Sequence, residues 1–215
     1  MNSTLQTKYH NALKYEIFVK EEYGFAKEQI RQASIIFDIW WHIWYFSQWC
    51  RELNNKAIIH YFEPIKENFN EAKRVLNNDD KIIFNNCWIA RFSWTWILLF
   101  NEEKTMQSSK FTSFLNKNWI EKEVSFIQLS DYLKKYSLSK IDVLKIDIEG
   151  MEFEVLSTWK EEWNIIKCFI AEIHLFNDEF KKYWKLLLET LKTKFTTVEI
   201  IPSWYHESIF LVFAY

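Results

Sequence analysis

Short apolar runs rich in β-branched residues alternate along the chain with segments whose apolar residues recur at helical spacing. Strands are predicted at 35–39, 57–64, 81–86, 141–147 and 168–174, and a closing antiparallel pair at 196–201 and 208–215. Helices are predicted over 8–32, 44–54, 64–76, 151–163 and 178–193. Strands that alternate with helices form a mostly parallel sheet with right-handed crossovers. The pattern therefore predicts an α/β fold with seven main strands and helices on both faces of the sheet.

The middle of the chain is less regular. Further strands are predicted at 96–101 and 124–129, on either side of a polar stretch. No repeat or low-complexity linker divides the sequence, so residues 1–215 are expected to form one domain. Its parts are an N-terminal helical segment, 1–33, and a core, 34–215.

Polar residues stand at or near the ends of several predicted strands. These residues are Asp38, Glu63, Asn86, Asp147 and His174. Open parallel sheets bind their ligands beyond the carboxyl ends of the strands. We therefore expect these side chains to converge at one edge of the sheet.

Charged residues alternate with apolar ones along the predicted strand at 141–147 and just beyond it. Alternation places Lys145, Asp147 and Glu149 on one side of the extended segment. Charges on one face of an interior strand are costly unless they are paired or functional, so both a structural ion-pair network and a catalytic group remain open. Gly150 is expected to let the chain turn into the next helix.

Tryptophan and glycine have unusual frequencies. The chain has 12 Trp and 2 Gly, whereas average usage predicts roughly 15 glycines at this length. Three tryptophans, Trp40, Trp41 and Trp44, fall in the predicted strand-to-helix loop after Asp38, where a phosphate- or nucleoside-binding loop needs close backbone approach and glycine.

We infer that UGA encodes glycine in the gene and has been written as tryptophan. The positions concerned are expected to lie in tight loops and are Trp40, Trp41, Trp44, Trp88, Trp94, Trp96 and Trp119. The alternative is that all the tryptophans are real and fill an aromatic core, which would leave an inactive scaffold.

With glycine at positions 40, 41 and 44, the stretch from Asp38 reads DIGGHIGYFS and resembles the motif DxGxNxGxFS of FkbM-type methyltransferases. FEPIKENF from Phe62, DVLKIDIEGME from Asp142 and AEIH from Ala171 are similar to the family's FEPxPxNF, DxLKIDVEGxE and VEIH. Ile65-Lys66 departs from the second motif. The resemblance runs from about residue 14 to 176 and leaves the acceptor-binding region unread.

The resemblance implies a Rossmann-like class I methyltransferase that uses S-adenosyl-L-methionine. Glu63 would accept hydrogen bonds from the ribose hydroxyls, as strand-end acids do for nucleoside cofactors. The remaining implied cofactor contacts are Asp38, Trp40, Trp41, His42, Trp44 and Asn86. On the catalytic side, Asp147 or His174 would take a proton from a hydroxyl acceptor, and Lys145 and Glu149 would orient that base.

The acceptor implied by the family is a hydroxyl on a sugar, lipid or secondary metabolite. A net charge of −2 argues against nucleic acid, and no apolar run is long enough to span a membrane. A polar start and three scattered cysteines favour a cytoplasmic protein without a disulfide framework. No metal is predicted, because nothing in the spacing of Asp147, Glu149, Glu172 and His174 demands one. A dinucleotide-dependent oxidoreductase remains the other enzyme class compatible with a strand–loop–helix followed by a strand-end acid.

Overall fold

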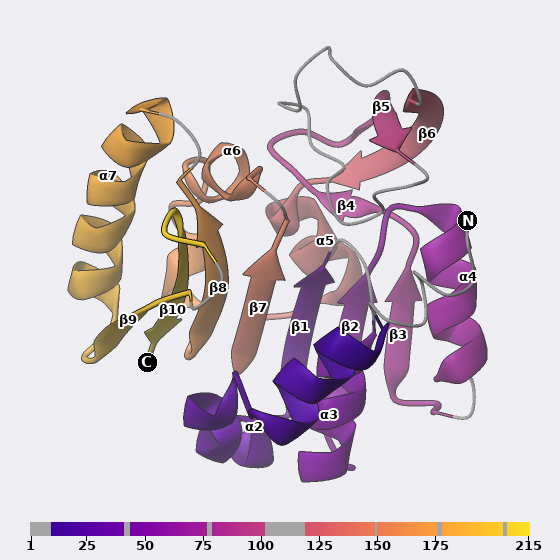
Figure 1. Ribbon diagram of the computed structural model, residues 1–215, viewed down its shortest axis with the longest axis horizontal. Coiled ribbons are helices and arrows are strands. Elements are labelled where there is room, and N and C mark those ends of the chain that lie inside the picture. The colour runs from indigo at the N-terminus through magenta and orange to yellow at the C-terminus, as the bar shows by residue number, and fades with distance from the viewer. Residues whose placement is uncertain are drawn as a thin grey trace.

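The computed structural model of the chain describes residues 10–40, 44–76, 79–101, 119–148, 150–175, 178–203 and 206–215. A seven-stranded sheet forms its centre, in the order β3-β2-β1-β7-β8-β10-β9 (Figure 1). The strands are β1 (Ile35–Trp40), β2 (Ile58–Phe62), β3 (Ile82–Asn85), β7 (Val143–Asp147), β8 (Phe169–His174), β9 (Val198–Pro202) and β10 (Ile209–Ala214). Each of them coincides with a strand predicted from the sequence.

The sheet is mostly parallel. Neighbours from β3 to β8 pair in parallel, and β10 pairs antiparallel with both β8 and β9. This confirms the predicted α/β class and the closing antiparallel pair. From β1 the chain adds β2 and β3 on one side and later returns to add β7 and β8 on the other. Such a reversal of strand order is where open α/β sheets bind ligands.

Helices cover both faces of this sheet (Figure 1). They are the π-helix η1 (Tyr15–Val19), the 3-10 helices η2 (Gly24–Ala26) and η3 (Glu162–Asn164), and the α-helices α2 (Lys27–Gln32), α3 (Tyr45–Leu53), α4 (Lys66–Val75), α5 (Leu129–Tyr136), α6 (Glu152–Leu156) and α7 (Asp178–Lys194). On one face, Ser47 of α3 contacts Asp38 of β1. On the other, Tyr132 of α5 packs on Phe37 of β1, with ring centroids 5.7 Å apart.

The prediction of one continuous helix over 8–32 is wrong. Residues 10–14 are helical and continue into η1, but the chain then breaks before η2 and α2. Glu21 has a φ of 53° in this break, a left-handed conformation that helices of L-residues do not tolerate. The apolar period hides the interruption because both pieces bury an isoleucine, Ile17 and Ile30.

The helix predicted at 151–163 is also shorter than expected. The α-helix α6 ends at Leu156, and a separate 3-10 turn, η3, follows. Just after α6, the hydroxyl of Thr158 donates a hydrogen bond to the Val155 carbonyl at 2.7 Å. Threonine side chains compete in this way with helical backbone bonding. Helix α5 was not predicted, and it takes over Leu129, the last residue of the strand expected at 124–129.

A second, three-stranded sheet lies beyond the carboxyl ends of the main strands (Figure 1). Its order is β4-β6-β5, with β4 (Trp88–Ile89), β5 (Trp94–Asn101) and β6 (Trp119–Ile127). The tight loops expected at Trp88, Trp94, Trp96 and Trp119 are therefore wrong, because these residues lie in strands. Trp40 is likewise the last residue of β1 rather than part of a loop.

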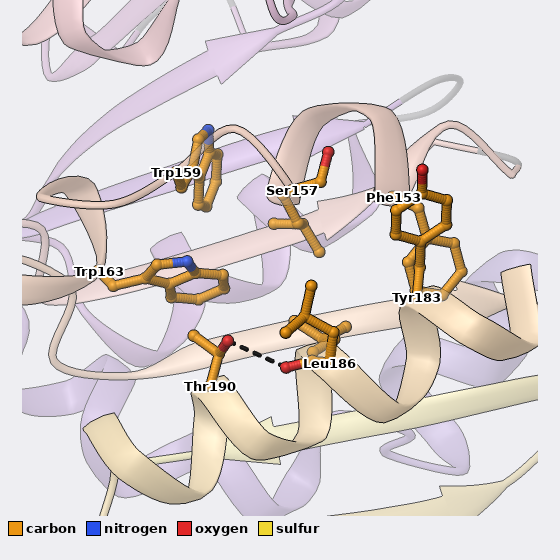
Figure 2. Close-up of a pocket in the computed structure, with 9 residues that line it drawn as sticks. Phe153, Ser157, Trp159, Trp163, Tyr183, Leu186 and Thr190 are labelled. Atoms are coloured by element: carbon orange, nitrogen blue, oxygen red, sulfur yellow. Dashed lines mark hydrogen bonds between the residues drawn. The ribbon is translucent and has the colours of Figure 1, made fainter.

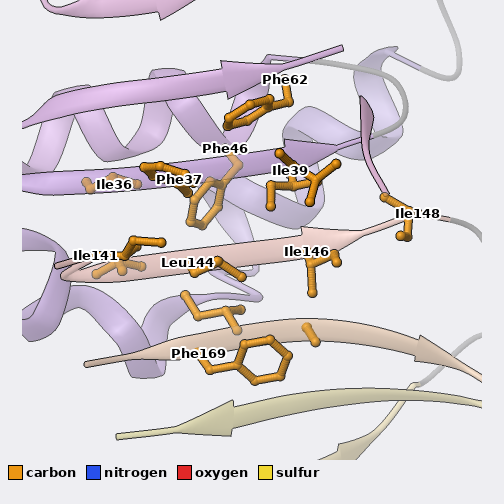
Figure 3. Close-up of a cluster of buried hydrophobic side chains, with 14 of the residues drawn as sticks. Ile36, Phe37, Ile39, Phe46, Phe62, Ile141, Leu144, Ile146, Ile148 and Phe169 are labelled. Atoms are coloured by element: carbon orange, nitrogen blue, oxygen red, sulfur yellow. The ribbon is translucent and has the colours of Figure 1, made fainter. Parts of the chain in front are cut away.

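The hydrophobic core lies along the central strands (Figure 3). Ile36, Phe37 and Ile39 of β1 and Leu144 and Ile146 of β7 have no exposed surface. Full burial of one such side chain contributes roughly 1.5–3 kcal/mol, so the ends of β1 and β7 are held in a rigid frame. Among the described residues, none of the helices has the length and apolarity that a membrane crossing requires.

Candidate active site

The strand register brings the predicted polar residues to one edge of the sheet. Trp40 at the end of β1 pairs with Asp147 at the end of β7. On the other side of β1, Ile39 pairs with Phe62, the residue before Glu63. Asp38, Glu63 and Asp147 therefore lie near three adjacent strand ends, as the sequence predicts.

Asp38 is fully buried and held by helix α3. The Ser47 hydroxyl donates a 2.5 Å hydrogen bond to Oδ2 of Asp38, whereas Oδ1 has no hydrogen-bond partner among the described residues. Burial raises the pKa of Asp38, and the nearby charge of Lys145 opposes that rise. Ser47 stands in the first motif of the sequence but was not among the predicted site residues.

Of the four loop residues predicted to contact the cofactor, Trp41 and His42 lie outside the described residues. The structure places the backbone of Trp40 in β1. Trp44 immediately precedes α3 and is 4% exposed. Its indole contacts the rings of His10 and Tyr45, each at a centroid distance of 5.7 Å, so it packs inward against the helical elements on that face.

Glu63 is also fully buried, directly after β2. Its Oε1 accepts the backbone N–H of Ile65 at 2.6 Å, and its Oε2 has no hydrogen-bond partner among the described residues. Burial raises the pKa of Glu63 well above its usual range, and hydrogen bonding from Ile65 works against that rise. Asn68 also lowers the pKa from nearby, but it makes no aligned hydrogen bond, since its own Nδ2 lacks a partner.

Asn86, the other predicted cofactor contact, binds the backbone that carries Glu63. Its Nδ2 donates to the carbonyl oxygens of Glu63 at 2.9 Å and Pro64 at 3.0 Å. The amide therefore fixes the course of the chain after β2.

Lys145 and Asp147 form a buried ion pair on one face of β7. The distance from Nζ to Oδ2 is 3.2 Å, and Lys145 has no exposed surface. The Lys145 ammonium also lies over the rings of Tyr23 and Phe46, 5.7 Å and 5.9 Å from their centroids. Burial raises the pKa of Asp147 to about 6; Lys145 opposes the shift and Glu172 adds to it. Glu149, predicted on the same face, lies outside the described residues.

His174 at the end of β8 is flanked by two acids that sequence reasoning did not assign. Its Nδ1 is 3.0 Å from Oε1 of Glu152, and its Nε2 is 3.4 Å from Oε1 of Glu172. Oε1 of Glu152 also accepts the backbone N–H groups of Ile148 and Gly150. Glu152 thereby joins His174 to the turn after β7.

The turn itself depends on Gly150. Gly150 has a φ of 95°, a conformation that only glycine adopts without strain. This confirms the predicted turn at that residue. Asp147, Glu152 and His174 each have one atom able to bind a metal, and these three atoms lie within 4.8 Å of one another.

Two acids of the N-terminal segment face the same site. The charge of Glu22 interacts with those of Glu172, Glu16 and Asp147. Burial raises the pKa of Glu22 to about 8, and repulsion from Glu172 and Glu16 adds to the shift. No motif marks Glu22, because only the packing of the helical segment over β7 and β8 brings it there.

A pocket of about 140 Å³ lies elsewhere, between α6, η3 and α7 (Figure 2). Its lining contains aromatic, aliphatic and hydroxyl side chains and no charged group, and includes Trp159, Trp163, Tyr183 and Leu186. Because no carboxylate, imidazole or amine lines this pocket, it lacks the groups that general acid–base catalysis needs. The strand-end acids remain the candidate active site.

The sequence profile described as the methyltransferase FkbM domain matches residues 37–199, which begin within β1 and include β2, β7 and β8. The chain belongs to this family. A curated relative, Methyltransferase 1 of Beauveria bassiana (strain ARSEF 2860), is 25% identical over 178 residues, which cover 74% of this chain and 71% of the relative. The resemblance inferred from the four motifs is thus confirmed.

Solved structures confirm the fold. A Streptococcus mutans protein in complex with SAH aligns with a TM-score of 0.55 and 10% identity over 88% of this chain and 94% of that chain. A SAM-dependent O-methyltransferase from Thermotoga maritima aligns with a TM-score of 0.53 and 10% identity over 92% of this chain and 65% of that chain. An rRNA methylase from Streptococcus thermophilus aligns with a TM-score of 0.53 and 10% identity over 88% of this chain and 92% of that chain. At such identities the likeness extends to the class I methyltransferase fold alone.

Proposed function

We propose that this FkbM-family chain transfers a methyl group from S-adenosyl-L-methionine to a hydroxyl group. The observation that carries the proposal is the pair of buried carboxylates at the ends of β1 and β2. Asp38 and Glu63 have no exposed surface, and each has one oxygen without a hydrogen-bond partner among the described residues. Buried polar groups are normally satisfied, so both oxygens are suited to accept hydrogen bonds from a bound molecule.

S-adenosyl-L-methionine carries hydroxyl and ammonium groups that could donate hydrogen bonds to these two carboxylate oxygens. Glu63 would accept from the ribose hydroxyls, as strand-end acids do for nucleoside cofactors. Asp38, Trp40, Trp41, His42 and Trp44 would border its amino-acid part. Asn86 would support the cofactor site indirectly, because its side chain holds the backbone of Glu63 and Pro64 in position. When bound, the sulfonium supplies a methyl group that is already reactive.

The acceptor would lie next to Asp147 and His174, at the adjoining strand ends. Asp147 or His174 would remove the proton of the hydroxyl, directly or through water. Lys145 would hold Asp147 in place through their 3.2 Å ion pair, and Glu149 would support the same group. The chain's main contribution would be alignment of the hydroxyl with the methyl group and exclusion of water.

A hydroxyl on a sugar, a lipid or a secondary metabolite is the proposed acceptor class. The small sheet β4-β6-β5 lies over the carboxyl edge (Figure 1), where it would contact the acceptor. A net charge of −2 does not favour a polyanionic acceptor such as RNA. The rRNA methylase among the structural neighbours does not change this, because it shares only the fold.

Calorimetric titration with S-adenosyl-L-methionine tests the cofactor assignment. Glu63→Ala removes a charge-assisted acceptor, a loss of about 1.5–3 kcal/mol, so the dissociation constant should rise roughly tenfold to a hundredfold. Glu52→Ala, at an exposed acid near the end of α3, is the matched control and should bind like the parent. Equal affinity of the Glu63→Ala variant would refute the role given to Glu63.

The titration should use both the chain as written and a version with glycine at positions 40, 41 and 44. Binding by the glycine version alone would support recoding of these positions. If neither version binds S-adenosyl-L-methionine, the inactive-scaffold alternative stands. A parallel titration with NAD addresses the oxidoreductase alternative, which predicts binding of that dinucleotide.

A further inference from the structure

We propose that Asp147, Glu152 and His174 form a binding site for a divalent transition-metal cation. The ligand atoms that these three residues offer lie within 4.8 Å of one another, and all three residues are buried. Ligands at about 2.0–2.2 Å from one metal are separated by roughly 3–4.4 Å. Shifts of less than about 1 Å would therefore bring all three onto one ion. This departs from the absence of a metal expected from the sequence.

The strongest sign of a missing partner is the second carboxylate oxygen of Glu152. Glu152 has no exposed surface, and its Oε2 is buried without a hydrogen-bond partner among the described residues. The other oxygen, Oε1, accepts two backbone N–H groups and lies 3.0 Å from Nδ1 of His174. A buried carboxylate oxygen with nothing to accept is costly, and a cation at the cluster would satisfy it.

The neighbouring contacts suit a metal-bound histidine. With Nδ1 of His174 on the cation, Nε2 keeps the ring proton and donates it to Oε1 of Glu172, 3.4 Å away. Metal-bound histidines almost always donate their second ring nitrogen to a carboxylate or carbonyl in this way. Lys145 binds Oδ2 of Asp147, so Oδ1 is the oxygen that Asp147 would offer.

The charge of the region also favours a cation. Glu152 and Glu172 lie 3.0 Å and 3.4 Å from the imidazole of His174, and Asp147 lies 3.2 Å from the ammonium of Lys145. Three carboxyl groups thus gather around His174 and Lys145, and a divalent ion would offset their negative charge.

An imidazole with two carboxylates suits Mn²⁺, Fe²⁺, Co²⁺ or Zn²⁺ better than Mg²⁺ or Ca²⁺, which prefer oxygen ligands throughout. Three protein ligands leave positions open for an oxygen of the substrate. This part of the inference rests on the proposed function, since that oxygen would be the acceptor hydroxyl. Bound to the cation, the hydroxyl would lose its proton more easily. With Asp147 and His174 on the metal, that proton would pass to water or to the carboxylate of Glu172 beside His174.

Binding of Mn²⁺ to the whole chain, measured by electron paramagnetic resonance without cofactor or acceptor, tests the site. The parent chain should bind one Mn²⁺. Glu152→Gln and His174→Gln should each weaken binding at least tenfold, whereas Glu154→Gln on the same helix α6 should not. Thermal melts identify any variant that fails to fold, and Asp147→Asn provides a third test of the ligand set.

The inference is overturned if the parent chain binds none of Mn²⁺, Co²⁺ and Zn²⁺ at one ion per chain. It is also overturned if the folded ligand variants bind Mn²⁺ as tightly as the parent. Binding of S-adenosyl-L-methionine without metal binding would remove the cation site and leave the proposed function intact. Metal binding without binding of S-adenosyl-L-methionine would support the cation site and contradict the proposed function.

Discussion

At the scale of single residues, Asp147→Asn is the sharpest test of the proposed chemistry. Asparagine has nearly the same shape, and its carbonyl oxygen still accepts a hydrogen bond from Lys145, so the variant should fold. It removes the negative charge that would act on the acceptor hydroxyl, directly or through a cation. Turnover with an identified acceptor should fall by about 10² or more, measured at saturating S-adenosyl-L-methionine.

The control for this variant is Asp178→Asn, which changes an acid whose side chain is 93% exposed and paired with Lys181 on α7. It should leave turnover unchanged. If turnover of the Asp147→Asn variant also stays at the parent level, proton removal belongs to His174 or the site only positions its acceptor.

The residues that the sequence predicted at the site share one property, because each follows or ends a recognisable strand. Strand ends can be predicted from periodicity, and parallel strands bring their ends to one edge. Glu152 and Glu172 stand in the motifs DVLKIDIEGME and AEIH, but neither ends a strand, so periodicity did not bring them to His174. Glu172 was considered only as a possible metal ligand. Glu22 lies in no motif, and its approach to Asp147 and Glu172 depends on how the N-terminal segment packs, which leaves no pattern in one sequence.

At the scale of elements, Asp142 joins the beginning of β7 to the beginning of β1. Its Oδ2 accepts the backbone N–H groups of Ser34 and Ile35 at 2.9 Å and 3.0 Å, and Lys140 and Lys167 pair with its carboxylate. Burial alone would raise the pKa of Asp142, but hydrogen bonds from Lys167, Ser34 and Lys140 outweigh it and lower the pKa to about 2.

This lowered pKa predicts a pH-dependent contribution to stability. The pKa is about 2 when folded and about 3.9 when unfolded, so the stabilisation is present above pH about 4 and is lost as the pH falls through about 2. Because the two lysines are exposed to solvent, we expect about 1–2 kcal/mol at pH 7. Urea unfolding should show Asp142→Asn less stable by that amount at pH 7, with the difference shrinking towards pH 2.

The matched control is Asp80→Asn, at an exposed acid between α4 and β3. Its difference from the parent should be near zero at both pH values. A deficit for the Asp142→Asn variant that stayed constant from pH 7 to pH 2 would show that shape, and not ionisation, links the two strands.

Elements differ in how far a pattern can predict them. The seven strands of the main sheet are short segments dominated by apolar and β-branched residues, and all were predicted. The break after η1 was not, because a left-handed residue such as Glu21 leaves the apolar period intact. The same limit applies to α5, whose first residue, Leu129, continues the apolar run of β6. Where one apolar segment of the sequence spans the end of a strand and the start of a helix, the boundary is set by tertiary packing and cannot be predicted from the pattern.

At the scale of the whole molecule, the reversal of strand order places the chemistry. The strand order reverses between the parallel neighbours β1 and β7, and the adjacent carboxyl ends of these two strands carry Asp38, Lys145 and Asp147. The core beneath them is wholly apolar at Ile36, Ile39 and Leu144. A rigid sheet therefore holds the acids. The N-terminal helical segment and the small sheet β4-β6-β5, which differ most from the predicted pattern, lie outside that sheet.

The whole-chain composition leads to the last prediction, that codons written as tryptophan read UGA in the gene. Two Gly and 12 Trp make 14 residues, close to the roughly 15 glycines expected at this length. The prediction covers the positions expected from the sequence to lie in tight loops, which are Trp40, Trp41, Trp44, Trp88, Trp94, Trp96 and Trp119.

The strands found at Trp88, Trp94, Trp96 and Trp119 weaken the case at those positions, since a strand tolerates tryptophan better than glycine. The decisive codons are those of Trp40, Trp41 and Trp44, after Asp38, where glycine restores the family motif. Reading the nucleotide sequence tests the prediction, and the mass of the protein purified from its own source checks it independently. UGG at all three positions would refute recoding, and the chain would then have to bind its cofactor beside three indoles or not at all.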